Sequence, residues 1–92
     1  MLRASERAPG LLVGNDVTLP GDVEIGARVI VHDGTVVGEG VRIMDGAVLG
    51  KPVALGARSK AARSEPAPLV VGPGATVGAR AVVLAGAAIG PP

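Results

Sequence analysis

An aliphatic residue recurs at every sixth position, and this short period constrains the fold more than any other feature of the chain. The positions are Val13, Leu19, Ile25, Val31, Val37, Ile43, Leu49 and Leu55, and the spacing resumes at Val71, Val77, Val83 and Ile89. Glycine follows most of these residues. A six-residue repeat is too short for a helical solenoid and is the hexapeptide signature of a parallel β-helix.

A second row of mostly apolar residues precedes the first row by two positions. Its members are Leu11, Val17, Val23, Val29, Thr35, Val41, Ala47, Val53, Leu69, Ala75, Ala81 and Ala87. Residues two apart share one face of a strand, so both rows should point inward. Turn-forming pairs such as Asn15-Asp16 and Asp33-Gly34 suit the corners between strands. Three hexads should close one coil, and the twelve hexads predict about four coils.

Composition agrees with a narrow tube and limits the chemistry. The 92 residues contain no Phe, Tyr, Trp or Cys, which removes disulfides, thiolate metal ligands and a cysteine nucleophile. One His and scattered carboxylates form no metal-ligand cluster, so we expect no metal. Nothing indicates nucleic-acid binding, a membrane span or a signal peptide, and we expect a cytoplasmic protein.

The repeat is interrupted once, after Leu55. Residues 57–68 are polar, basic and rich in Pro near their end, which predicts a loop that protrudes from a corner, either as part of a binding face or as a neutral excursion. Residues 1–10 should form an N-terminal cap or tail, and residues 11–92 the β-helix domain. The repeat runs to Ile89 without a C-terminal cap, so we expect the natural chain to continue or another molecule to cover this end.

The residue before each aliphatic position should point outward. Counted without interruption, the first outward row holds Leu12, Ile30, Val48 and Thr76, the second Thr18, Val36, Ala54 and Val82, and the third Glu24, Arg42, Val70 and Ala88. The first row is the most apolar and predicts a subunit contact. Alternatively, strand propensity alone filled these positions.

The pattern [Leu/Ile/Val]-Gly-x-x-x-x spans residues 11–92, for example as Val37-Gly38-Glu39-Gly40-Val41-Arg42 and Val77-Gly78-Ala79-Arg80-Ala81-Val82. It resembles the hexapeptide-repeat acyltransferase superfamily, most closely the members that acetylate sugars or sugar nucleotides. The resemblance implies an all-β, left-handed parallel β-helix, although parallel crossovers are usually right-handed. It also implies a homotrimer, acetyl-coenzyme A as co-substrate in a groove between subunits, and a His as general base.

His32, the only histidine, is the candidate catalytic residue. It stands in a position that is usually Gly, with Gly14, Gly50 and Gly78 as expected stacked equivalents, and it follows Ile30 by two on the apolar side. A histidine suits deprotonation of an amine or hydroxyl, and Asp33 could orient its ring. A substrate or interface contact and an ordinary surface residue remain the alternatives.

Arg58, Lys60 and Arg63 are candidates for contacts to the coenzyme phosphates, because Arg and Lys match phosphate charge. Solvated loop charges are the alternative reading of these three residues.

The sequence therefore predicts the β-helix portion of an acyl-coenzyme A dependent acyltransferase that acetylates an amine or hydroxyl of a sugar or sugar nucleotide. A non-catalytic trimeric scaffold, or an inactive fragment of such an enzyme, is the alternative. A third hypothesis is a regulatory β-helix of the kind that is attached to a nucleotidyltransferase domain.

Overall fold

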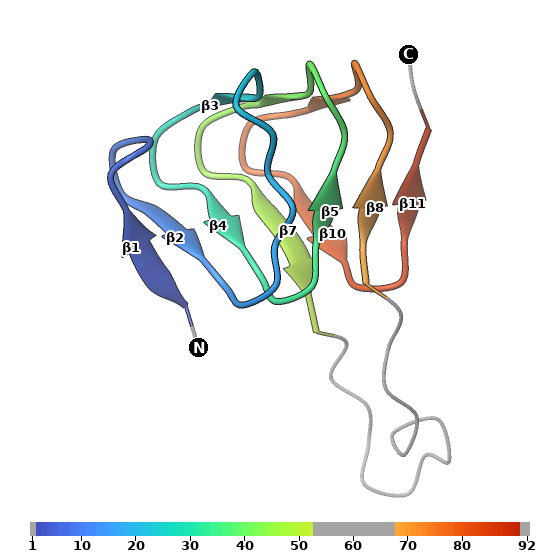
Figure 1. The fold of residues 1–92 in the computed structure, drawn as a ribbon, viewed down its shortest axis with the longest axis horizontal. Coiled ribbons are helices and arrows are strands. Elements are labelled where there is room, and N and C mark those ends of the chain that lie inside the picture. The colour runs from blue at the N-terminus through green and yellow to red at the C-terminus, as the bar shows by residue number, and fades with distance from the viewer. Residues whose placement is uncertain (1, 53–67, 91–92) are drawn as a thin grey trace, which may run out of the picture.

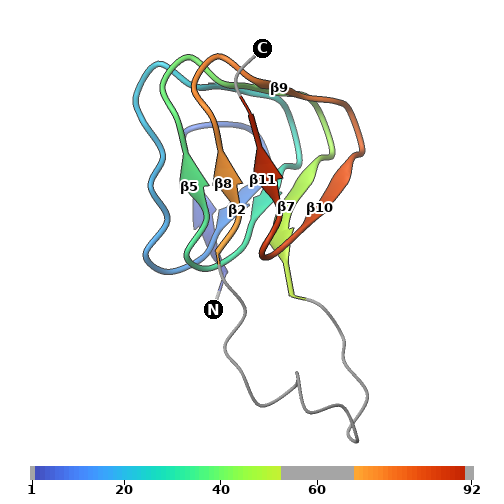
Figure 2. The ribbon, with the colours of Figure 1, turned by 90° about the vertical axis from the view of Figure 1, so that its right-hand side faces the viewer.

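The chain forms three sheets of short strands and passes from one sheet to the next in each circuit (Figures 1 and 2). The computed structural model describes residues 2–52 and 68–90, and all regular structure in these ranges is β-strand. No segment in them forms a helix that could cross a membrane.

Sheet A has five strands in the order β1 (Arg3–Ser5), β2 (Leu11–Val13), β4 (Ile30–Val31), β7 (Val48–Lys51) and β10 (Val82–Leu84). Sheet B has the order β11 (Ala88–Ile89), β8 (Val70–Val71) and β5 (Val36–Val37), and Thr18 extends it through an isolated bridge to Val36. Sheet C has the order β3 (Glu24–Ile25), β6 (Arg42–Ile43) and β9 (Thr76–Val77).

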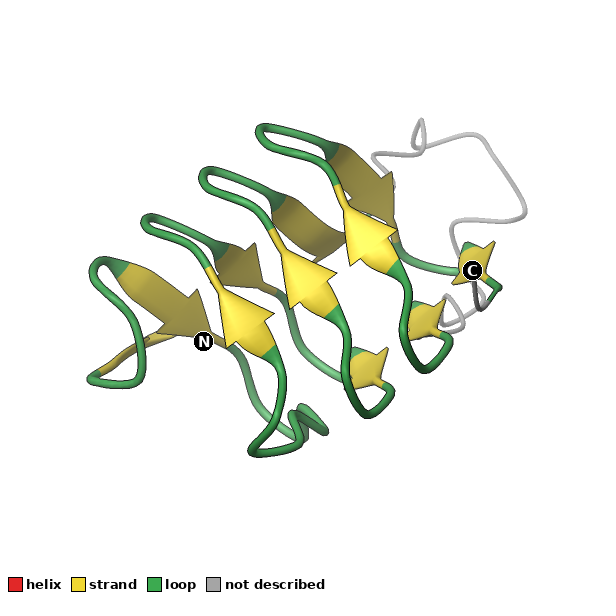
Figure 3. Ribbon diagram, turned by 90° about the horizontal axis from the view of Figure 1, so that it is seen from above, coloured by secondary structure: helices red, strands yellow, loops and turns green. Residues whose placement is uncertain are grey.

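Successive circuits, which we call coils, lie side by side with their strands parallel (Figure 3). Leu12 pairs with Ile30, Ile30 with Val48, and Glu24 with Arg42, so paired residues are 18 apart along the chain. This confirms the prediction of an all-β chain with parallel strands and three hexads in each of these coils. The strands are two to four residues long because each must turn a corner before the next sheet.

The predicted count of hexads across the interruption is wrong. Val70 was expected beside Glu24 and Arg42, but it pairs with Val36 in sheet B. As a result Thr76 pairs with Arg42 in sheet C, and Val82 pairs with Val48 in sheet A. Hexads are locally equivalent, so the sequence does not show which sheet a strand will join after an insertion, and backbone pairing decides it. The predicted inward residues Val53 and Leu55, and most of the loop predicted at 57–68, lie outside the described residues.

The two inward rows form the core. The fully buried side chains with the largest volumes include Leu11, Ile43, Leu49 and Leu69. Every described member of the two rows is buried or packs against this cluster, which confirms the predicted inward pattern. Several inward residues of the first and last coils, such as Val13 and Ile89, are only partly buried, since a neighbouring coil covers them on one side alone.

The N-terminal residues cover the first coil. Strand β1 runs antiparallel to β2, with Ala4 opposite Leu12, and so occupies the edge of sheet A. The guanidinium of Arg7 donates hydrogen bonds to the carbonyl oxygens of Leu19 (2.9 Å), Val23 (3.4 Å) and Pro20. These contacts supply partners to backbone groups that no earlier coil can reach.

Glycine at two corners lets a carboxylate from the next coil reach the backbone. Asp33 Oδ1 accepts a hydrogen bond from the Asn15 amide, and Asp45 Oδ1 accepts one from the Ala27 amide, both at 2.7 Å. A Cβ atom at Gly26 would stand 2.6 Å from the backbone nitrogen of Asp45, and one at Gly14 would stand equally close to that of Asp33. Both glycines are therefore required by close packing between coils.

We expect Gly26→Ala to lower the free energy of unfolding by about 1–3 kcal/mol, the usual effect of overpacking a tight contact. Gly78→Ala is the matched control, because Gly78 ends the next strand but one in the same sheet and a Cβ there meets nothing within 4 Å. The chain has no aromatic residue, so urea unfolding would be followed by far-ultraviolet circular dichroism. Equal destabilisation by the two changes would contradict the packing argument.

Candidate functional site

His32 lies directly after β4, at the corner where the chain leaves sheet A. His32 is half-buried, and its backbone amide donates a hydrogen bond to the Leu49 carbonyl at 2.9 Å. In the coils on either side Gly14 follows Val13 of β2 and Gly50 follows Leu49 within β7, so both hold the position equivalent to His32, as predicted. Gly78 follows β9 of sheet C, so the prediction that it stacks with His32 is wrong, for the same reason as the error in the hexad count.

Thr35 fixes the backbone of His32. It is fully buried, the one polar residue in the core of the described ranges, and its hydroxyl donates a hydrogen bond to the His32 carbonyl at 2.8 Å. Thr35 is the one polar residue of the inward row, and this departure is the signal in the sequence that it forms a buried hydrogen bond.

Gly50 forms a β-bulge beside His32. Strand β10 pairs Val83 with Leu49 and then Leu84 with Lys51, which leaves Gly50 as an extra residue in β7. Gly50 is buried with φ +72°, and a Cβ there would collide with the Thr35 hydroxyl and stand 3.7 Å from Cβ of His32. Bulges often redirect side chains next to functional sites. The hexapeptide pattern gives no sign of this bulge, because it arises from the pairing of β7 with β10.

The carboxylate of Asp33 is directed to the neighbouring coil, where it accepts the hydrogen bond from the Asn15 amide. The His32 ring forms no hydrogen bond with residues 2–52 or 68–90. The described part of the chain thus holds the backbone of His32 in place and leaves its ring to contact other groups.

An apolar outward row crosses sheet A next to His32. Leu12, Ile30 and Val48 are half-buried, and Val82, which takes the place predicted for Thr76, is 55% exposed. Leu84 adds a further exposed apolar side chain at 45%. The corrected count therefore makes this row more apolar than the sequence analysis predicted. His32 follows Ile30 by two residues and so lies at the border of the row.

The candidate residues for contacts to the coenzyme phosphates, Arg58, Lys60 and Arg63, lie outside the described residues. Among those described, no group of three His, Asp or Glu side chains is arranged to hold a metal ion.

We expect Thr35→Val to lower the free energy of unfolding by about 1 kcal/mol, because the isosteric change removes one buried hydrogen bond. The matched control is Thr18→Val, since Thr18 points outward and its loss should change stability by less than about 0.5 kcal/mol. Urea unfolding and the amide chemical shifts of residues 32–35 would measure both effects. Equal stability of the two variants would show that the Thr35 hydroxyl does not anchor His32.

Comparison of the chain with protein-family models, with curated proteins and with solved structures finds no match.

Proposed function

We propose that this chain is the left-handed parallel β-helix of a hexapeptide-repeat acyltransferase, located in the cytoplasm. In this proposal it transfers an acetyl group from acetyl-coenzyme A to an amine or hydroxyl of a sugar or sugar nucleotide. The proposal rests on one observation above all: the single histidine lies on an anchored backbone, beside a bulge, at the border of the apolar row on sheet A.

In the proposed reaction His32 is the general base. Its neutral ring accepts the proton of the acceptor amine or hydroxyl as the nitrogen or oxygen attacks the thioester carbonyl carbon. The new carbon–nitrogen or carbon–oxygen bond forms and the carbon–sulfur bond breaks. The coenzyme leaves as a thiolate and is protonated to the thiol, with the His32 proton as its source.

The apolar row is the proposed contact in a homotrimer. Four aliphatic side chains from adjacent strands form it, and such a patch on a small domain marks a site of association. Packing this face against a second subunit would place His32 at the seam, where acetyl-coenzyme A would bind. Arg58, Lys60 and Arg63 stay proposed contacts to its phosphates.

A trimeric scaffold without catalytic activity is the second candidate. Asp33 anchors the Asn15 amide, and no group among residues 2–52 and 68–90 orients the His32 ring. The side chain of a general base is commonly oriented by a third group. The scaffold shares the apolar seam with the enzyme but requires no acetyl-coenzyme A.

We expect His32→Ala to reduce acetyl transfer to glucosamine or UDP-glucosamine by about 100-fold or more, the usual contribution of a positioned general base. Release of coenzyme A can be followed with a thiol reagent, since the protein has no cysteine. Glu39→Gln, at the exposed corner that follows β5, is the control and should keep full activity. Unchanged turnover in His32→Ala would remove the assignment, and absence of transfer by the unmodified chain would favour the scaffold.

We also expect Ile30→Glu to convert the trimer into monomers, because it places a charge in the centre of the apolar row. Val36→Glu is the matched control, since Val36 holds the same half-buried outward position in sheet B. Native mass spectrometry with and without acetyl-coenzyme A would give both the subunit number and the bound ligand. Monomers of the unmodified chain, or equal dissociation by both changes, would contradict a seam on sheet A.

A further inference from the structure

Two arginines occupy corner positions whose backbone favours glycine. At the corner between sheets C and A, the amides of Arg28, Gly46 and Arg80 each donate a hydrogen bond to the preceding coil. All three have positive φ, at 58°, 73° and 59°, and Gly10 has φ 69° at the same corner. Glycine adopts this conformation freely, whereas a residue with a Cβ atom is strained in it. Strained residues of this kind are often retained for function.

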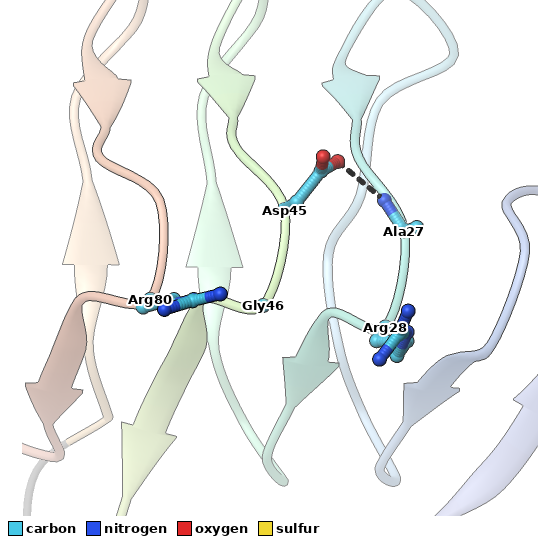
Figure 4. Close-up of a pocket in the computed structure, with 5 residues that line it drawn as sticks. All are labelled: Ala27, Arg28, Asp45, Gly46 and Arg80. Carbon is cyan, nitrogen blue, oxygen red and sulfur yellow. Dashed lines mark hydrogen bonds between the residues drawn. The ribbon is translucent and has the colours of Figure 1, made fainter.

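The two arginines border a hollow with a glycine at its centre. Ala27, Arg28, Asp45, Gly46 and Arg80 line a volume of about 220 Å³ (Figure 4). Gly46 lies one coil from each arginine. The Cα atoms of Arg28 and Arg80 are therefore about 10 Å apart, twice the spacing of adjacent strands. The Cγ atom of Arg80 would stand 3.3 Å from a Cβ at Gly46, and Figure 4 shows the Arg80 side chain reaching across towards Gly46.

The hollow carries excess positive charge. Neither arginine forms an ion pair with any residue in 2–52 or 68–90, whereas Arg42 pairs with Glu24. Asp45 is the one carboxylate in the lining, and it is turned towards the Ala27 amide, away from Arg80 (Figure 4). Arg28 and Arg80 therefore line a space whose single carboxylate is already hydrogen-bonded.

We propose that this hollow binds the phosphoryl group of a small phosphorylated ligand. Guanidinium groups match the charge and the oxygen geometry of phosphate. Two guanidinium groups balance the double negative charge of a phosphate, whereas a carboxylate carries a single charge. The open volume of the hollow admits the anion, and the missing Cβ atom at Gly46 leaves room for the Arg80 side chain beside it. The site is independent of the acyl-transfer proposal, because Arg28 lies before β4 and His32 lies after it, at opposite ends of the strand.

The test is a titration of the isotope-labelled protein with inorganic phosphate at constant ionic strength, followed by NMR at the Gly46 amide and the arginine Nε groups. We expect saturable shifts at Gly46, Arg28 and Arg80 and none at Arg42. Arg28→Gly and Arg80→Gly should each weaken binding by about tenfold or more, the effect of losing a charge-assisted hydrogen bond. Both variants should stay folded, because glycine suits their backbone conformation.

Two further variants sharpen the result. Asp45→Asn keeps an oxygen for the Ala27 amide and removes the negative charge, so phosphate should bind more tightly. Arg42→Ala removes an arginine from sheet C and should leave binding unchanged. The proposal is overturned if phosphate gives no saturable shift, if the double variant Arg28→Gly/Arg80→Gly binds as well as the unmodified chain, or if acetate binds as tightly as phosphate.

Discussion

Backbone hydrogen bonding between equivalent residues of neighbouring coils, 18 apart along the chain or 34 apart across the interruption, is the interaction on which the rest of this structure depends. Strands of two to four residues are too short to be stable alone, and they persist here because each one pairs with the equivalent strand of the neighbouring coils. This dependence explains the gradient of burial along the stack. Val29, Val41 and Leu49 in the middle are completely enclosed, while Val83 and Ile89 in the last described coil are only half-buried.

The spacing between coils leaves little room at the corners, and the sequence resolves this in different ways at different corners. Gly14 and Gly26 make space for the carboxylates of Asp33 and Asp45, which join one coil to the next through the backbone. His32 follows its strand at the position that Gly14 and Gly50 hold in the adjacent coils, and the glycine at position 50 leaves room beside it. The missing Cβ atom at Gly50 thus leaves room for a histidine at a position where the adjacent coils have glycine.

The two proposed sites share sheet A but use different physical devices. Near His32, a buried hydroxyl and a bulge fix the backbone and leave the ring available for contacts. At the corner before β4, Arg28 and Arg80 have a left-handed backbone conformation and line a hollow that also contains Gly46. Both depart from the regular repeat, as expected where function rather than folding selects the residue.

The amino-acid sequence by itself determined the period, the inward rows and most corners, because a six-residue repeat leaves few ways to bury one aliphatic face. It also singled out His32 through its departure from glycine. Only the tertiary structure decided which strands stack after the interruption, and so moved Val82 into the apolar row and Thr76 out of it. The bulge at Gly50 and the hollow between Arg28 and Arg80 likewise arise from pairing between coils, whereas the Thr35–His32 hydrogen bond joins residues three apart within one corner. Contacts between residues 18 or more apart depend on the register of the stack, which a locally uniform repeat does not specify.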